Sequence, residues 1–301
     1  MSFSSETKEE LSKINNLVNK EAVKYEFIGY LLSINTIINN KSVKYSTSSE
    51  YNINRFSKLL NNINILDYKI DLQGKIYFIT LSKSKLKKIV EINSNEIIIN
   101  QIITTNEENI RALVRGIFLG SGSINNPENK YHLEMNLSNI EYANYIKKLL
   151  EKYAIYLKML EKEKSYSLYI KEGEEISKFL AFIGANKSVL KFEGIRVQRE
   201  MNNKVNRIVN CETANLNKTI NASINQVEAI RYLQKINKFE KLDDNLKEIA
   251  LLRLKNPNIP LSELGKLLKE PIGKSGVNYR LKRIMQIAED SKGENIWIKK
   301  N

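Results

Sequence analysis

Hydrophobic residues recur along this chain with two periods, and the change of period divides it into a mixed region and a helical region. In the stretch YHLEMNLS, Leu133, Met135 and Leu137 alternate with polar residues, which predicts a strand with one buried face. Apolar residues at helical spacing follow over 142–150 and predict a helix that covers such a sheet. In the last third of the chain the alternation disappears, and every periodic segment is helical.

The mixed pattern occurs twice. Gly29 in FIGYLLSINTI and Gly116 in RGIFLGSGSI occupy similar helix ends 87 residues apart. Strand-like SVKYSTS precedes a helix as YHLEMNLS does, at nearly the same offset, and IYFITL from Ile76 and YSLYIK from Tyr166 supply further strands. A period of this size indicates two tandem αββαββα halves in a duplicated α+β domain.

These patterns set the expected domain layout. It consists of the duplicated domain at 1–187, with halves at about 20–100 and 105–187, a helical linker at 188–220 and an all-helical domain at 221–301. We also expect Thr7 and Glu10 to cap a short opening helix reciprocally, because a hydroxyl and a carboxylate three residues apart can form a capping box.

Two neighbouring segments near the end, LSELGKLL and KSGVNYRLKRIMQIAE, predict a helix-turn-helix. A short helix, a tight connection and a second basic helix are what docking into a DNA major groove requires. We expect Ser262 to cap the first helix with its hydroxyl. Gly265 leaves room for close packing, and Leu264, Leu267 and Leu268 are expected to form the inner face.

The second helix is expected to begin near Lys274 or Ser275, after Pro271 and Gly273 interrupt the helical pattern. Its predicted core residues are Val277, Leu281, Ile284 and Ala288. The predicted DNA-binding residues are Lys274, Ser275, Asn278, Tyr279, Lys282 and Arg283. Asn and Arg can make bidentate contacts with adenine and guanine edges, whereas Lys and Tyr more often hold phosphate. The alternative is a solvated basic face on an ordinary helical bundle.

The charge balance agrees with a polyanionic partner. Lys and Arg number 48 against 34 acids, which gives a net charge of +14 and favours nucleic acid through counterion release. AT-rich coding would also enrich Asn, Lys and Ile, so the position of the charges must decide. The opening MSFSSETKEELSKI lacks the apolar core of a secretory signal, and no run reaches the roughly 18 apolar residues of a membrane span. We therefore expect a cytoplasmic protein with no membrane partner.

The chain offers few residues for metal or thiol chemistry. The single cysteine, Cys211, cannot form an internal disulfide, and the single histidine, His132, leaves no cluster for zinc. We expect Cys211 to be a small buried residue and His132 to lie beside a strand. No metal, cofactor or small-molecule substrate is expected.

The stretch VRGIFLGSGS resembles the helix end that names the LAGLIDADG homing endonucleases, in which two such helices pack together and each presents a carboxylate for a divalent metal. Magnesium prefers anionic oxygen ligands. In this chain the acidic position falls on Ser121, and alignment of Gly29 with Gly116 places its counterpart at Ile34. Neither replaces an aspartate, so no catalytic residue is expected. A nuclease built on other acids would use Glu107, Glu108, Glu134 or Glu141.

Together these features resemble the WhiA family of bacterial regulators over essentially the whole chain. The most specific stretches are SFSSETKEEL, RGIFLGSGSINNPENKYHLEMNLS, NRIVNCETANLNKT and ELGKLLKEPIGKSGVNYRLKRI. The resemblance implies a non-catalytic LAGLIDADG-like domain and a helix-turn-helix similar to the fourth region of sigma factors. In NRIVNCETANLNKT and just before it, candidate secondary DNA or inter-domain contacts are Arg199, Arg207 and Lys218.

The favoured hypothesis is a transcriptional regulator that binds double-stranded DNA at promoter or chromosomal sites in the nucleoid. The resemblance implies a role in cell division and chromosome segregation, in sporulation for sporulating relatives, and a further partner such as RNA polymerase or another transcription regulator. Two alternatives remain at this point. One is a metal-dependent DNA endonuclease, and the other is a broad nucleoid-associated or division adaptor, which the distributed charge would suit.

Overall fold

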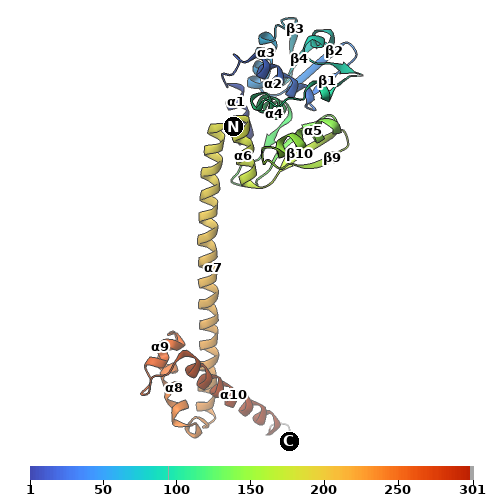
Figure 1. The fold of residues 1–301 in the computed structure, drawn as a ribbon. Helices are drawn as coiled ribbons and strands as arrows, with labels where there is room; N and C mark the ends of the chain where they lie inside the picture. Colours follow the sequence, from blue (N-terminus) through green and yellow to red (C-terminus); the bar gives the residue numbers. More distant parts are fainter. Residues whose placement is uncertain (94, 299–301) are drawn as a thin grey trace. The chain divides into compact units, whose positions relative to one another are not determined.

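The computed structural model in Figure 1 describes residues 1–93 and 95–298. Their contacts divide the chain into two units, one ending at Met201 and the other beginning at Asn202. Helix α7 (Asn186–Lys235) begins in the first unit and ends in the second, so the expected linker at 188–220 lies within this helix. No helix in the described ranges is both long enough and apolar enough to cross a membrane.

The first unit contains the expected repetition. The first half comprises α2 (Lys20–Leu32), β1 (Thr36–Ile38), β2 (Ser42–Thr47), α3 (Glu50–Asn62), β3 (Tyr68–Gln73) and β4 (Ile76–Ser82). The second comprises α4 (Glu107–Ser121), β7 (Ser123–Ile124), β8 (Leu133–Leu137), α5 (Ile140–Glu151), β9 (Lys158–Lys162), β10 (Ser165–Ile170) and α6 (Gly173–Ile183). The antiparallel sheets have matching orders, β1-β2-β4-β3 and β7-β8-β10-β9, which confirms the duplicated α+β fold.

The first half departs from the expected pattern at its end. A final α-helix is replaced there by a 3-10 helix, η1 (Lys83–Lys88), the short hairpin of β5 (Ile92–Asn93) and β6 (Glu96–Ile97), and η2 (Ile99–Gln101). The sequence KSKLKK carries only Leu86 as an apolar residue, and Leu86 is fully buried. One apolar residue does not make the stripe that a longer covering helix needs.

Alternation produces the predicted half-buried strand in the second sheet. Leu133, Met135 and Leu137 of β8 are buried, while the residues between them are partly exposed. The helix predicted after this strand is α5, whose buried residues include Tyr142 and Ile146. His132 stands directly before β8 and stacks on the ring of the neighbouring strand's Tyr169, which confirms its place beside a strand.

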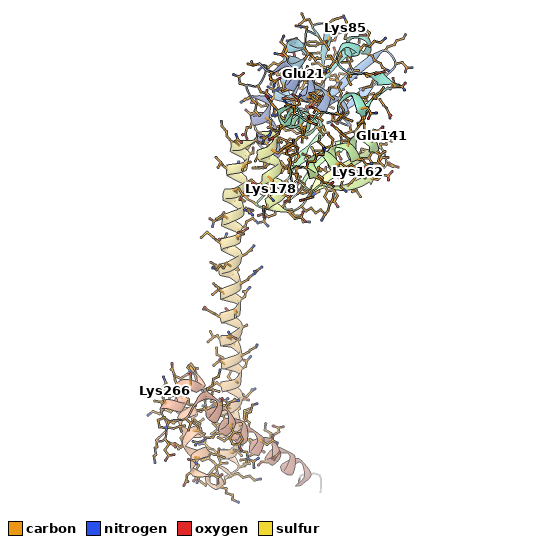
Figure 2. All side chains as sticks on the ribbon, in the orientation of Figure 1. Glu21, Lys85, Glu141, Lys162, Lys178 and Lys266 are labelled. Carbon is orange, nitrogen blue, oxygen red and sulfur yellow. The ribbon has the colours of Figure 1, made fainter. Side chains whose placement is uncertain are left out.

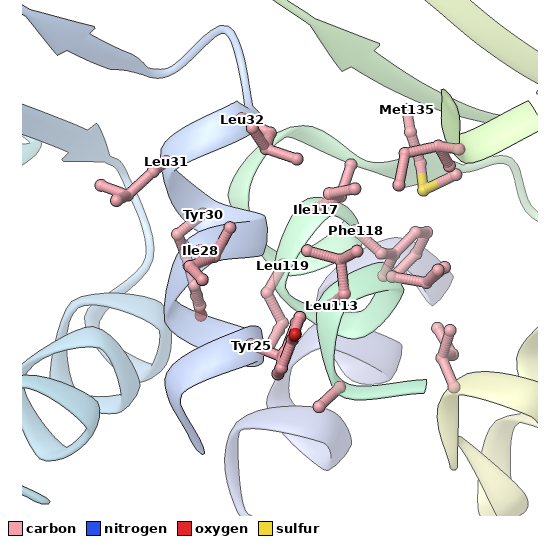
Figure 3. Packing of buried hydrophobic residues seen from close by; sticks show 14 of the residues in the cluster. Tyr25, Ile28, Tyr30, Leu31, Leu32, Leu113, Ile117, Phe118, Leu119 and Met135 are labelled. Atoms are coloured by element: carbon pink, nitrogen blue, oxygen red, sulfur yellow. The ribbon is translucent and has the colours of Figure 1, made fainter. Parts of the chain in front are cut away.

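Helices α2 and α4 pack through glycine. A Cβ atom added to Gly116 would lie 2.0 Å from the Glu26 carbonyl oxygen, and one added to Gly29 would lie 2.2 Å from the Leu113 carbonyl oxygen. A backbone carbonyl group cannot move aside as a flexible side chain can. Only glycine at these two positions therefore lets α2 and α4 come this close. Figure 3 shows apolar side chains of the two helices, with Leu32 and Ile117 among them, packed around the contact.

The opening helix α1 (Phe3–Ser12) is capped differently from the expectation. Ser2 accepts the N-terminal hydrogen bond from Ser5, and the Thr7 hydroxyl donates within the helix to the Phe3 carbonyl oxygen. The predicted reciprocal cap was therefore wrong, because the helix starts at Phe3, well before Thr7. The Glu10 carboxylate instead accepts from the backbone N–H groups of Lys187 and Ser188, at 2.7 and 2.9 Å, at the start of α7.

The second unit is helical, as expected. The last part of α7 packs with η3 (Phe239–Lys241), α8 (Asp244–Lys255), α9 (Leu261–Lys266) and α10 (Lys274–Ile298) around a separate apolar core. Cys211 is exposed on α7, so its predicted burial was wrong: every residue of α7 from 201 to 222 is exposed, and this stretch has no core to enter.

Candidate functional site

Helices α9 and α10 form the predicted helix-turn-helix, and a glycine makes the turn tight. The Ile272 N–H donates to the Gly265 carbonyl oxygen at 3.2 Å, and a Cβ on Gly265 would lie 2.2 Å from the Ile272 carbonyl oxygen. Two details differ from the expectation. Pro260 occupies the N-cap of α9 in place of Ser262, and Leu267 is about half exposed because it follows the short helix as its C-cap residue.

Helix α10 buries the predicted face. Its core residues are Val277, Leu281, Ile284 and Ala288, all of them buried. The six residues predicted to bind DNA lie off this core: Lys274, Ser275, Tyr279, Lys282 and Arg283 are exposed, and Asn278 is partly exposed. The structure gives no ion pair to Lys274, Lys282 or Arg283 with any residue it describes, so these charges face solvent. Figure 2 shows the side chains around this unit, with Lys266 labelled on α9.

Near the ends of α2 and α4, neutral groups occupy Ile34 and Ser121, the two positions that the sequence motif predicts as the acidic ones. The Ser121 hydroxyl donates to the Asn136 carbonyl oxygen and accepts from the Asn136 N–H at 3.2 Å. The Ile34 N–H donates to the same carbonyl oxygen at 3.1 Å. Asn35 donates from its side-chain amide to the Gly120 carbonyl oxygen at 2.7 Å. These groups satisfy one another and offer no anionic oxygen to a metal ion.

The four glutamates considered as alternative nuclease residues do not form a cluster that could bind a metal ion. Glu107 pairs with Arg111 at 2.6 Å, and Glu141 lies at the start of α5 (Figure 2). Across the described ranges, no three His, Cys, Asp or Glu residues group in a way that could hold a metal ion. Glu134 accepts from Lys162 and Ser167; burial works against its charged form, but these bonds and the Lys162 charge outweigh burial and lower the pKa of Glu134.

A buried charge cluster fixes the two halves of the first unit to each other. The Glu26 carboxylate on α2 accepts from Arg55 Nε at 2.7 Å and from Arg115 Nη1 of α4 at 3.1 Å. Arg115 also donates from Nε to the Ile183 carbonyl oxygen at 2.8 Å. Burial disfavours the charge on Arg55, but hydrogen bonding and attraction to Glu26 more than offset it and raise the pKa of Arg55. Sequence reasoning missed this cluster; Glu26 inside the apolar run AVKYEFIGYLL was the available signal.

The three candidate secondary contacts have different surroundings. Arg199 belongs to the first unit, where it donates to the Pro127 carbonyl oxygen and lies 4.6 Å above the ring of Tyr131. Arg207 and Lys218 are exposed on the part of α7 that belongs to the second unit. Of the three, Lys218 alone lines a pocket together with two of the predicted DNA-binding residues, Lys274 and Asn278.

A duplicated α+β unit with glycine-packed helices, followed by a helix-turn-helix unit, defines a protein that joins a LAGLIDADG-like domain to a helix-turn-helix domain. Residues 110–202 match the WhiA LAGLIDADG-like domain and residues 205–288 match the WhiA C-terminal HTH domain. A probable cell division protein WhiA from Clostridium tetani is 39% identical over 316 residues, covering 96% of this chain and 98% of that protein.

Two further comparisons agree. A probable cell division protein WhiA from Clostridium botulinum strain Hall is 44% identical over 231 residues, covering 73% of each chain. The crystal structure of full-length DUF199/WhiA from Thermatoga maritima superposes with a TM-score of 0.60 at 30% identity, covering 96% of this chain and 99% of that one. The chain belongs to the WhiA family.

Proposed function

We propose that this chain is a sequence-specific, non-catalytic DNA-binding regulator that acts in cell division and chromosome segregation. The observation that carries the proposal is the two-sided helix α10, whose apolar face is buried while a polar and basic face is exposed. A second helix of a helix-turn-helix places such a face against base edges in the major groove. In this role Asn278 and Arg283 read bases, while Lys274 and Lys282 hold phosphates.

The cellular part of the proposal comes from the relatives. These relatives are named as probable cell division proteins, and the match covers nearly the full length of the Clostridium tetani protein. We extend that role to transcription regulation at chromosomal sites in the nucleoid, with RNA polymerase or another regulator as a further partner. The net charge of +14 is compatible with both selective and broad DNA binding.

Genome-wide binding tests the selective form of the proposal. Chromatin immunoprecipitation with sequencing of the intact chain should find discrete sites that share a motif, and these should disappear when Asn278 and Arg283 are both replaced by Ala. Broad occupancy without a shared motif would instead support a nucleoid adaptor and refute the proposal. The exposed Lys235 on α7, replaced by Gln, is a matched control that should keep the sites.

The non-catalytic part rests on the neutral, internally bonded helix ends at Ser121 and Ile34. We expect supercoiled DNA to stay intact when incubated with the purified chain in Mg²⁺ or Mn²⁺. Specific cleavage that persists through further purification and disappears on substitution of Glu134 would establish a nuclease built on other acids.

A further inference from the structure

The second unit contains a pocket that helix-turn-helix geometry alone does not explain. Its volume is about 250 Å³, and α7, α8, the start of α9 and the start of α10 all contribute to its wall. The lining residues are Lys218, Thr219, Ala222, Gln226, Arg253, Pro260, Leu261, Ser262, Lys274 and Asn278. Three of them are cations and none is acidic, so the pocket favours an anion.

The strongest indication of a ligand is Arg253, which lies deep in the unit. Its side chain is 1% exposed, and its Nε atom has no hydrogen-bond partner among the residues that the structure describes. Nη1 donates to the carbonyl oxygens of Ile259 at 2.9 Å and Pro257 at 3.2 Å, which holds the guanidinium in place at the pocket wall. Burial lowers the pKa of Arg253, and no described carboxylate offsets it. A buried cation without a counterion is costly unless a ligand compensates it.

A second buried group in the same wall also lacks a partner within the described ranges. Gln226 is 5% exposed, and its Oε1 atom makes no hydrogen bond there. Ser223, one turn before it on α7, donates to the Pro257 carbonyl oxygen and so fixes this part of the helix to the loop before α9. The Gln226 amide oxygen is an acceptor, so it suits a water molecule that accompanies a bound anion.

The remaining walls supply further donors. Lys218 and Lys274 form no ion pair with any residue that the structure describes, and the first turn of α10 leaves backbone N–H groups without intrahelical partners. Helix N-termini favour anions for this reason. The volume lies below the roughly 300–1,000 Å³ typical of small-molecule sites, which favours a single phosphate group over a nucleotide effector.

We propose that this pocket holds one backbone phosphate of bound DNA between Arg253, Lys218 and Lys274. The phosphate thereby sets the register of α10, whose Asn278 also lines the pocket. This inference rests on the proposed DNA-binding function and adds α7 to the interface. It assigns a role to the NLNKT segment, because Lys218 and Thr219 then face the DNA backbone beside the helix-turn-helix.

The test combines two measurements on the full chain, with Lys218→Gln as the probe variant, since Lys218 is exposed and makes no bond that folding needs. On a random-sequence duplex, the slope of log binding constant against log salt concentration should fall by about 1 in magnitude, the value expected when one phosphate interaction is removed. Lys235→Gln, a change of the same charge on the same helix outside the pocket, should leave the slope unchanged. An unchanged slope in Lys218→Gln would overturn the proposal.

The second measurement locates the phosphate. Neutral methylphosphonate linkages are placed one at a time along a duplex selected by footprinting. The intact chain should lose affinity severalfold at one linkage per bound unit, and Lys218→Gln should lose less than twofold at that same linkage. Equal losses in both proteins at every linkage would refute a phosphate in this pocket.

Failure of the pocket and failure of the proposed function have different signatures. If Lys218→Gln leaves the salt slope unchanged while Asn278→Ala removes site preference, the pocket proposal fails and the function stands. If no sequence preference is found but Lys218→Gln lowers the slope on random DNA, the pocket stands and selective reading fails.

Discussion

Two parts of this protein differ in whether their polar groups are bonded internally. One part is the ends of α2 and α4 in the first unit, and the other is the exposed face of α10 in the second unit. At the former, Ser121, Asn35 and the Ile34 N–H are all turned inward and bonded to backbone partners of the same unit. On α10, the cations Lys282 and Arg283 are exposed and form no ion pair with a described residue. A polar group that is already hydrogen-bonded within the protein must break that bond to contact a ligand. An exposed, unpaired cation can bind a ligand without that loss. This difference agrees with the proposed function, in which the LAGLIDADG-like fold supplies structure and the C-terminal helices supply recognition.

The largest expected effect tests the inward arrangement at its most buried charge. Glu26→Gln leaves Arg55 and Arg115 buried without a counterion and should destabilise the first unit by about 3–5 kcal/mol. Urea denaturation followed by circular dichroism measures this loss. Glu21→Gln, an exposed change on the same helix (Figure 2), should cost less than about 0.5 kcal/mol. Equal effects of the two substitutions would contradict the assigned role of the cluster.

The next effect tests the helix contact between the two halves. Gly116→Ala places a methyl group against the Glu26 carbonyl oxygen, 2.0 Å away before any adjustment, and should cost about 1–3 kcal/mol through forced separation of α2 and α4. Thermal denaturation reports it. Gly194→Ala is the matched control, because its Cβ would meet open space within α7 and should stabilise by up to about 1 kcal/mol. Tolerance of Gly116→Ala would show that the helices are not held by close approach.

A smaller loss of stability is expected at Ser121, the position that the motif predicts as acidic in a LAGLIDADG nuclease. Ser121→Ala removes both hydrogen bonds to Asn136 and should destabilise by about 1–2 kcal/mol, because the Asn136 N–H loses its acceptor in a partly buried site. Ser177→Ala on α6 is a suitable comparison, since its hydroxyl makes no hydrogen bond to any described residue. If the two variants unfold at the same urea concentration, the helix end is not closed by Ser121.

The smallest effect concerns Lys8 of α1, whose pKa burial lowers to about 8 with no carboxylate partner in the described ranges. Below pH 8 the ammonium is charged in both folded and unfolded chains, so folding carries the cost of its burial. Between pH 8 and about 10.5 the folded chain loses the proton first, and stability rises. Lys8→Met should therefore be more stable than the parent at pH 7, by about 1 kcal/mol or less for a partly exposed side chain, with the gap closing by pH 10.5. A pH-independent gap would contradict this.

Sequence patterns predicted the local features well, and tertiary contacts account for what they missed. Alternation located β8 and helical spacing located the core of α10, because both depend on residues close in the chain. The Glu26 cluster joins residues up to 89 positions apart, which no local period records. Arg253 was missed although it follows Leu246 and Ile249 at inner-face spacing; a charge on an apolar stripe was the signal.

The ends of α2 and α4 contain residues that the sequence predicted and one partner that it did not. Ser121 and Ile34 were predicted from the motif as the acidic positions, because the absence of an acid can be read directly from the sequence; that assignment stays a prediction. Their partner Asn136 was not, because it faces them only after β8 folds against α4. The six candidate residues of α10 remain a prediction about DNA, since exposure shows that they are available and not what they bind.

Site discrimination by the purified chain tests the central claim most directly. Fluorescence anisotropy gives the ratio of Kd on a random duplex to Kd on a footprint-selected duplex for the intact chain, for the double variant Asn278→Ala, Arg283→Ala and for Ser121→Ala. The ratio should fall by about 10-fold or more in the α10 variant, because removal of each base-reading side chain costs about 1–3 kcal/mol of discrimination. It should not change in Ser121→Ala. An unchanged ratio in the α10 variant, or a fall confined to Ser121→Ala, would contradict the assignment of recognition to the second unit.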